Sequence, residues 1–212
     1  MTNHTLAIVI EASAVLVSAV SGMIVASQKR LDLVGTYMLA VVTAFGGGTL
    51  RDVLLDRRPL FWVIHEEYLL IILGLCLAFV YSPRLYQLAR TLDKRGEIVD
   101  ALGLGLFSLT GVGFALQAGM PLFVVALFGV ITGTFGGVLR DVMISEIPQI
   151  FRPGALYAVP AFLGSCVYLG ALRIGAPAVI AETLGFGAIV TLRLLSIYHR
   201  DFTLPLPHWL RS

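Results

Sequence analysis

The chain has 212 residues, of which 58% are apolar and 13% are charged, and its formal net charge is +2. Soluble domains average about 45–50% apolar and about 25% charged residues, so this composition excludes an ordinary soluble globular protein. The small net charge also gives no support to nucleic-acid binding.

Seven apolar runs predict an all-α membrane protein with a single transmembrane domain over residues 1–212. A spanning helix needs ~20 largely apolar residues, because its backbone polar groups must be satisfied within the segment. In chain order, the predicted spans cover residues 6–27, 33–54, 65–82, 98–118, 121–144, 155–173 and 177–197. We expect residues 198–212 to form a short C-terminal tail.

Lys and Arg residues are distributed unequally over the predicted loops and span ends. If the N-terminus is outside, eleven of them lie on the inner side, and only Arg51, Arg57, Arg58 and Arg173 lie on the outer side. Cytoplasmic loops are enriched in Lys and Arg. We therefore expect an integral protein of the cell (inner) membrane, with its N-terminus outside and its C-terminus in the cytoplasm.

The first and second halves of the chain align at a shift of 89 residues, which places Gly47 on Gly136. The match runs without a gap from about residue 9 to about residue 59, and it is densest at GGTLRDV (47–53) and GGVLRDV (136–142). Each unit contains three predicted spans, an odd number, so the second unit must enter the membrane from the opposite side. The sequence therefore predicts an inverted three-plus-three repeat, residues 6–82 and 98–173, followed by a seventh helix at 177–197.

Clusters of glycine occur at matching places inside the second and fifth predicted spans. Glycine destabilises a helix by ~1 kcal/mol relative to alanine, and such clusters are a cause of kinks. Transporters built from inverted repeats place their sites between the units, where corresponding helices are interrupted. We expect the working site where two broken helices face each other, although close helix packing at small residues is an alternative. The predicted kinks lie at Gly46, Gly47, Gly48, Gly133, Gly136 and Gly137.

Hydroxyl side chains are available to line a path through these helices. Ser18 and Ser21 lie on one stripe of the first span, and Thr110 lies on the equivalent stripe of the fourth. Such a set offers neutral oxygens to a cation, although a single hydroxyl in a membrane helix often bonds to its own backbone. The predicted pore-lining residues are Ser18, Ser21, Thr43, Thr49, Ser108, Thr110, Thr132 and Thr134.

Two adjacent pairs of charges, Arg51-Asp52 and Arg140-Asp141, follow the glycine clusters. Ionisable residues inside a membrane are costly and indicate function by default, although snorkelling to the interface is an alternative. We expect these four side chains near the two mouths of a pore, because a charge held at its centre would trap an ion. Adjacent residues do not face each other on a helix, so each arginine is expected to pair across helices.

The sequence shows neither a nucleophile and base at a recognisable spacing nor a metal-ligand motif. We therefore predict no enzyme activity, no cofactor and no metal site.

In these features the chain resembles the bacterial branch of the trimeric intracellular cation (TRIC) channels. The resemblance rests on the seven-span plan, the inverted repeat and the doubled Gly-Gly-x-Leu-Arg-Asp stretch. It implies a homotrimer in the lipid bilayer, with one hourglass pore per protomer between the second and fifth helices. Members of this family conduct monovalent cations passively, with potassium favoured. Bacterial relatives have also been labelled glycine transporters, so a secondary transporter for a small solute such as glycine is the alternative function.

Overall fold

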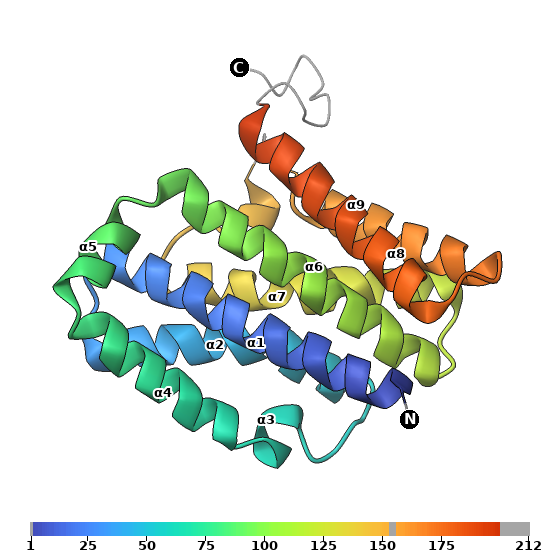
Figure 1. Cartoon of the computed structure of the whole chain (residues 1–212), viewed down its shortest axis with the longest axis horizontal. Helices are drawn as coiled ribbons and strands as arrows, with labels where there is room; N and C mark the ends of the chain where they lie inside the picture. Colours follow the sequence, from blue (N-terminus) through green and yellow to red (C-terminus); the bar gives the residue numbers. More distant parts are fainter. Residues whose placement is uncertain (1, 153–155, 200–212) are drawn as a thin grey trace.

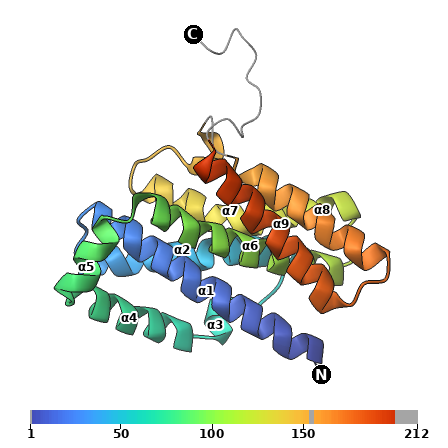
Figure 2. The same cartoon turned by 45° about the horizontal axis from the view of Figure 1, so that its top comes forward.

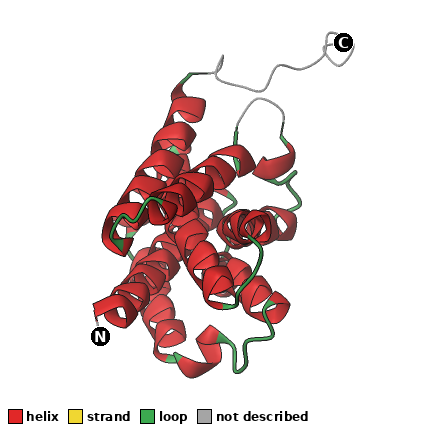
Figure 3. Ribbon diagram, turned by 90° about the vertical axis from the view of Figure 1, so that its right-hand side faces the viewer, coloured by secondary structure: helices red, strands yellow, loops and turns green. Residues whose placement is uncertain are grey.

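The computed structural model describes residues 2–152 and 156–199, without the side chains of residues 2–8 and 93–95. Within these ranges the chain forms helices and connecting loops and contains no strand (Figure 3). The elements are α1 (Thr2–Gln28), α2 (Leu33–Leu54), α3 (Phe61–Ile64), α4 (Glu67–Val80), α5 (Pro83–Arg90), α6 (Asp93–Gln117), α7 (Leu122–Met143), η1 (Gln149–Phe151), α8 (Ala158–Arg173) and α9 (Ala178–Tyr198). From residue 200 onward, the predicted tail lies outside the described residues.

Helices occupy the positions of the seven predicted spans, but they differ in length. In the described part of the chain, α1, α2, α6, α7 and α9 are long and apolar enough to cross a membrane. The helices at the third and sixth predicted spans are shorter, because α4 has 14 residues and α8 has 16. At 1.5 Å per residue, each is shorter than the ~30 Å hydrocarbon core. The protein is therefore helical and rich in apolar spans, and seven full crossings remain a prediction.

The third predicted span, residues 65–82, ends earlier than expected. α4 and α5 are bent by 90° at the break between them. Ser82 caps α5, because its hydroxyl oxygen accepts a hydrogen bond from the backbone N–H of Leu85, and Pro83 occupies the first turn. Proline lacks an N–H and favours the first turn of a helix over its interior. The Ser-Pro step therefore starts a new helix in a new direction.

Four helices, α1, α2, α6 and α7, form the centre of the bundle (Figures 1 and 2). α1 packs against α2 and α6, and α7 packs against the same two helices. α4 packs beside α2 in the first unit, and α8 packs beside α7 in the second. α9, which has no counterpart in the repeat, packs on α8 and α6.

Large apolar side chains lie exposed on the outer faces of this bundle. Val34, Leu70 and Phe123 are each about two-thirds exposed, and they lie on α2, α4 and α7. Many other large apolar side chains are also exposed in the described part of the chain, and extensive exposed apolar surface marks contact with a membrane or with another protein. The outside of the bundle is therefore suited to contact with lipid.

α2 and α7 cross at the glycine clusters, where their backbones touch. A Cβ atom on Gly47 would overlap the carbonyl oxygen of Thr132, and one on Gly136 would overlap the carbonyl oxygen of Thr43. Gly47 aligns with Gly136 and Thr43 aligns with Thr132 in the repeat, so the same contact is made twice. Residues without a Cβ permit this close approach.

Neither helix is interrupted at its glycine cluster. α2 is helical throughout Leu33–Leu54, and α7 is helical throughout Leu122–Met143. The expected break in each helix is therefore not present. The reason is that tight packing at the crossing compensates for the low helix propensity of glycine. A bend at Gly46, Gly47, Gly48, Gly133, Gly136 or Gly137 that keeps the helical hydrogen bonds stays a prediction.

Candidate functional site: two arginine clusters and a polar cavity

The first cluster consists of Glu11, Arg51 and Asp52. Arg51 Nη2 donates a hydrogen bond to Glu11 Oε1 on α1 at 2.8 Å, and Arg51 Nε donates to Asp52 Oδ1 at 2.9 Å. Asp52 Oδ2 also accepts the backbone N–H of Phe61 at 3.2 Å. All three cluster side chains are buried. One guanidinium therefore joins α1 to the end of α2, and its aspartate partner holds the segment that follows.

The second cluster consists of Asp100, Arg140 and Asp141, the repeat equivalents of the first three residues. Arg140 Nη1 donates to Asp100 Oδ1 on α6 at 2.6 Å, and Arg140 Nε donates to Asp141 Oδ1 at 2.9 Å. Asp141 Oδ2 accepts the backbone N–H of Gln149 at 3.1 Å. The sequence repeat is thus also a repeat of side-chain geometry.

The expected pairing of these arginines is confirmed in one respect and wrong in another. Each arginine pairs across helices, Arg51 with Glu11 and Arg140 with Asp100. Each also pairs with the aspartate that follows it, which we did not expect. Adjacent residues on a helix point in different directions at their Cβ atoms. The arginine side chain is long enough for its guanidinium group to reach the neighbouring carboxylate nevertheless.

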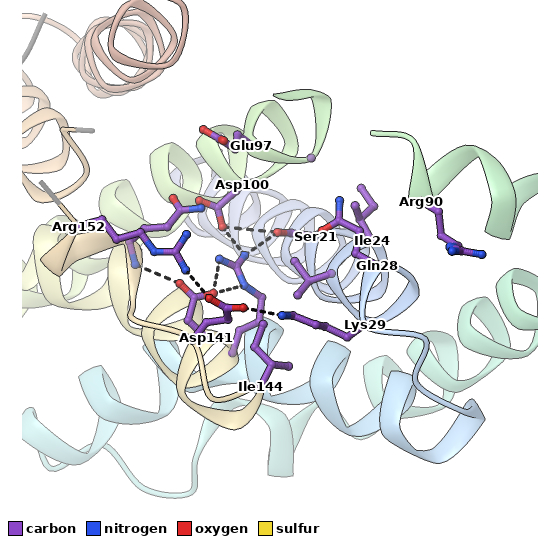
Figure 4. Close-up of a pocket in the computed structure, with 15 residues that line it drawn as sticks. Ser21, Ile24, Gln28, Lys29, Arg90, Glu97, Asp100, Asp141, Ile144 and Arg152 are labelled. Atoms are coloured by element: carbon purple, nitrogen blue, oxygen red, sulfur yellow. Dashed lines mark hydrogen bonds and ion pairs between the residues drawn. The ribbon is translucent and has the colours of Figure 1, made fainter. Parts of the chain in front are cut away.

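A polar cavity of about 680 Å³ reaches the second cluster (Figure 4). It is bounded by the C-terminal end of α1, the beginning of α6, the end of α7 and the loop that leads to η1. Its charged and polar lining comprises the second cluster together with Ser21, Gln28, Lys29, Arg90, Glu97, Glu146, Gln149 and Arg152. Arg140 and Asp141 therefore line a cavity, and their place at the mouth of a pore stays a prediction.

Glu146 links two walls of this cavity. Its Oε1 atom accepts a hydrogen bond from Lys29 Nζ at 2.5 Å, and its Oε2 atom accepts one from Arg152 Nη2 at 3.2 Å. The hydrogen bond from Lys29 lowers the pKa of the Glu146 carboxyl below its ordinary value, and the charges of Lys29 and Arg152 act in the same direction.

Replacing Lys29 by glutamine is expected to raise the pKa of Glu146 toward the ordinary glutamate value of about 4.3. Because the native pKa is depressed, the stabilisation from this pair is present at neutral pH and is lost as the pH falls through the folded-state pKa. Both side chains are 41% exposed, so we expect little change in overall stability. A carbon-13 NMR titration of the glutamate carboxyls in lipid nanodiscs measures the shift. An unchanged Glu146 titration in Lys29→Gln would contradict the assignment, and Arg152→Gln is the matched control with the smaller expected shift.

Most of the predicted pore-lining hydroxyls are buried in the helix packing. Thr43, Thr110 and Thr134 donate hydrogen bonds to carbonyl oxygens of their own helices, which is the structural role considered above. Ser108 and Thr132 are fully buried, and their hydroxyls have no hydrogen-bond partner among the described residues.

The other three hydroxyls of the predicted set differ in their surroundings. Ser21 lines the polar cavity, and its Oγ atom accepts a hydrogen bond from Arg140 Nη1 at 2.9 Å. Ser18 is buried, and Thr49 lines a mostly apolar pocket beside Trp62 and Phe135. The structure therefore brings Ser21, but neither Ser18 nor Thr49, into the polar cavity.

Arg193 on α9 is a buried candidate that the sequence reasoning did not single out. Its Nη2 atom donates to Gln149 Oε1 at 2.5 Å, and its Nη1 atom donates to the carbonyl oxygen of Leu156 at 3.1 Å. Its guanidinium carbon lies 4.9 Å from the centroid of the Tyr157 ring. Arg193 thus ties α9 to the loop beside the second cluster. Its position inside the seventh predicted span was an available signal.

Phe114 on α6 is a second residue that the sequence reasoning missed. The centroid of its ring lies 4.2 Å from the guanidinium carbon of Arg51 and 3.6 Å from that of Arg57. Both distances are within the range of cation–π contacts. Phe114 aligns with Val25 in the repeat. This difference inside an otherwise similar segment could have drawn attention to Phe114 in the sequence.

Comparison with known families places the chain among bacterial membrane proteins. A family model described as a glycine transporter matches it twice, over residues 8–84 and 97–173, close to the two predicted units. The UPF0126 inner membrane protein YadS of Escherichia coli is 36% identical over 185 residues, which cover 85% of this chain and 86% of that protein. The UPF0126 membrane protein YvgT of Bacillus subtilis is 35% identical over 150 residues, which cover 70% of this chain and 72% of that protein.

Comparison with solved structures gives close matches to TRIC channels. The TRIC trimeric intracellular cation channel orthologue from Rhodobacter sphaeroides has a TM-score of 0.84 and 35% sequence identity, over 92% of this chain and 98% of that one. A structure from work on the structural basis for conductance through TRIC cation channels has a TM-score of 0.79 and 31% identity, over 94% and 96% of the two chains. The chain therefore belongs to the family described as glycine transporters, and it is a bacterial member of the TRIC fold family.

Proposed function

We propose that this protein is a passive channel for monovalent cations, with potassium as the favoured ion and one path in each protomer. The path passes the crossing of α2 and α7, enclosed by α1, α2, α6 and α7, and it has one arginine cluster on each side. The observation that carries this proposal is the polar cavity of about 680 Å³ that ends at the second cluster.

The charge of the second cluster favours cations. There one guanidinium faces two carboxylates, so an excess of one negative charge remains when all groups are ionised. At the first cluster, Arg57 also pairs with Asp52 and balances the corresponding excess. Because each carboxylate is already bonded to an arginine, a passing cation meets a weakened field and is not held tightly. Conduction needs this balance, since an ion must enter readily and also leave.

The twofold pattern of contacts supports an inverted repeat within this channel. Gly47 meets Thr132 and Gly136 meets Thr43, so each unit uses the same surface against the other. Reciprocal contacts of this kind arise when a twofold axis relates two units. With that axis in the membrane plane, the two clusters lie toward opposite faces of the bilayer, at the two ends of an hourglass path.

We further propose the assembly and placement that the sequence predicts. The Rhodobacter sphaeroides relative is described as trimeric, and YadS is described as an inner membrane protein. This chain accordingly forms a homotrimer in the cell inner membrane, with its N-terminus outside and its C-terminus in the cytoplasm. The polar cavity then opens to the cytoplasm, because it lies at the C-terminal end of α1.

Recording from the purified protein in planar bilayers tests the channel proposal. We expect stepwise currents in a potassium gradient and a reversal potential that shows potassium preferred over sodium. Silent bilayers that contain protein shown to be folded and inserted would count against a channel.

A secondary transporter for glycine is the second candidate, because the matching family model carries that description. The cavity lining also offers positive and negative side chains to a zwitterion, and Arg90 and Glu97 are among these side chains. Uptake of labelled glycine into proteoliposomes separates the two functions. Saturable uptake without stepwise currents would favour the transporter, whereas currents without uptake would favour the channel.

A further inference from the structure

The two arginine clusters are alike, but the side chains that cover them differ. The repeat aligns Phe114 near the first cluster with Val25 near the second. It also aligns Arg57 with Glu146. The residue before each of them, Asp56 or Ser145, has a positive φ and lies two positions beyond the end of its helix. The backbone conformation is therefore similar at both ends of the path. The side chains differ, because Phe114 is replaced by Val25 and the positive Arg57 is replaced by the negative Glu146.

At the first cluster, Phe114 and Arg57 form one connected cover. Asp52 Oδ1 accepts hydrogen bonds from Arg51 Nε at 2.9 Å and from Arg57 Nη1 at 3.2 Å. The guanidinium carbons of both arginines lie within 4.2 Å of the centroid of the Phe114 ring. The ring is thus held by two cations that share one carboxylate oxygen, and it lies directly against the buried Arg51.

At the second cluster, the equivalent side chains leave a cavity beside the arginine, although Arg140 itself is buried. Glu146, in the place of Arg57, is bonded to Lys29 and Arg152 and not to the cluster. Val25, in the place of Phe114, lines the cavity of about 680 Å³, as do Arg140 and Asp141.

We propose that Phe114 and Arg57 form a lid that closes the path at the first cluster, while the polar cavity leaves the path open at the second cluster. This inference rests on the proposed channel function and assigns Phe114 as the residue whose movement admits ions at the closed end. Contacts between an aromatic ring and guanidinium groups are individually weak, so the ring leaves its place by a change of rotamer without unfolding the helices.

Exchanging the two repeat-matched residues tests the lid in bilayer recordings. Phe114→Val is expected to raise the mean potassium current about fivefold, the change that follows from losing two cation–π contacts at the weak end of their usual range. Val25→Phe places a ring at the open end and is expected to lower the current. An unchanged current in Phe114→Val, beside a conducting wild type, overturns the lid.

A second measurement does not depend on conduction. Gly48 lies one turn before Arg51, and a Cβ there would have Arg51 Nη2 as its nearest neighbour at 3.8 Å, so a cysteine can be introduced. In a background with Cys76→Ala and Cys166→Ala, we measure the reaction of Gly48→Cys with a positively charged, water-soluble thiosulfonate, with and without Phe114→Val. The lid predicts slow reaction with Phe114 present and about fivefold faster reaction with valine.

The outcomes of the two measurements separate the lid from the channel. Equal rates of thiol reaction with and without Phe114→Val overturn the lid. Faster reaction in Phe114→Val, with no current from any variant, supports the lid as a barrier to water and contradicts the channel.

Discussion

Replacing Arg140 by glutamine is expected to destabilise the folded protein by about 3–5 kcal/mol, the usual cost of removing one partner from a buried ion pair. Arg140 is 2% exposed and is the arginine bonded to both Asp100 and Asp141. Without it, two carboxylates remain buried beside each other without the guanidinium that offsets their desolvation and repulsion. Thermal unfolding of the protein in detergent measures the effect, with an expected fall in Tm of roughly 6–20 °C.

A charge-balanced variant serves as the control for this prediction. In Arg140→Gln combined with Asp100→Asn and Asp141→Asn, the cluster retains groups of similar shape without a buried charge. We expect this variant to recover most of the lost Tm. If Arg140→Gln alone has the Tm of the wild type, the cluster is not a tightly coupled ion group. The same comparison at Arg51, with Glu11 and Asp52, tests whether both clusters behave alike.

Replacing Gly47 by alanine is expected to destabilise the protein by about 1–3 kcal/mol through overpacking. The added Cβ would overlap the carbonyl oxygen of Thr132, and backbone cannot yield as a flexible side chain does. α2 and α7 must therefore separate at their crossing. We also expect a lower potassium current, because the path passes this crossing in the proposed channel. The Tm and the mean bilayer current of the same preparation measure both effects.

Gly48 provides a matched control on the next position of the same helix. A Cβ at Gly48 would have its nearest neighbour at 3.8 Å, an ordinary contact distance. Gly48→Ala is therefore expected to leave the Tm unchanged within about 0.5 kcal/mol of stability, or to raise it slightly through the better helix propensity of alanine. Equal losses of stability in Gly47→Ala and Gly48→Ala would show that helix flexibility, and not close packing, is what the cluster provides.

The positions of the helices could be predicted from the sequence because apolar runs of bilayer length are a local property. The predicted second span, residues 33–54, coincides with α2, and the fifth differs from α7 by one residue at each end. The 90° bend between α4 and α5 was missed, although Ser82 and Pro83 are a local signal for a new helix start. An apolar run indicates that a segment is buried in lipid or protein, but it does not indicate the direction of the helix axis.

The repeat and its charged residues could also be located from the sequence, whereas their partners could not. The doubled Gly-Gly-x-Leu-Arg-Asp stretch identifies Arg51 and Arg140 as equivalent positions. That they pair with Glu11 and Asp100, 40 residues earlier in the chain, depends on how far each helix is rotated and shifted against its neighbour. That information lies in the packing of α1 on α2 and of α6 on α7.

By itself, the sequence determined that this is a helical membrane protein with a repeated unit, and it located the glycine clusters and the two arginine–aspartate pairs. Only the tertiary structure decided what these residues do. The glycines allow two unbroken helices to touch, because a carbonyl oxygen of the opposite helix occupies the space of a Cβ. The arginines join helices from within the bundle, because carboxylates from other segments reach them. Phe114 lies against Arg51 of the first cluster, whereas Val25, its repeat equivalent, lines the cavity beside the second cluster. This difference arises from contacts between helices and could not be read from either residue alone.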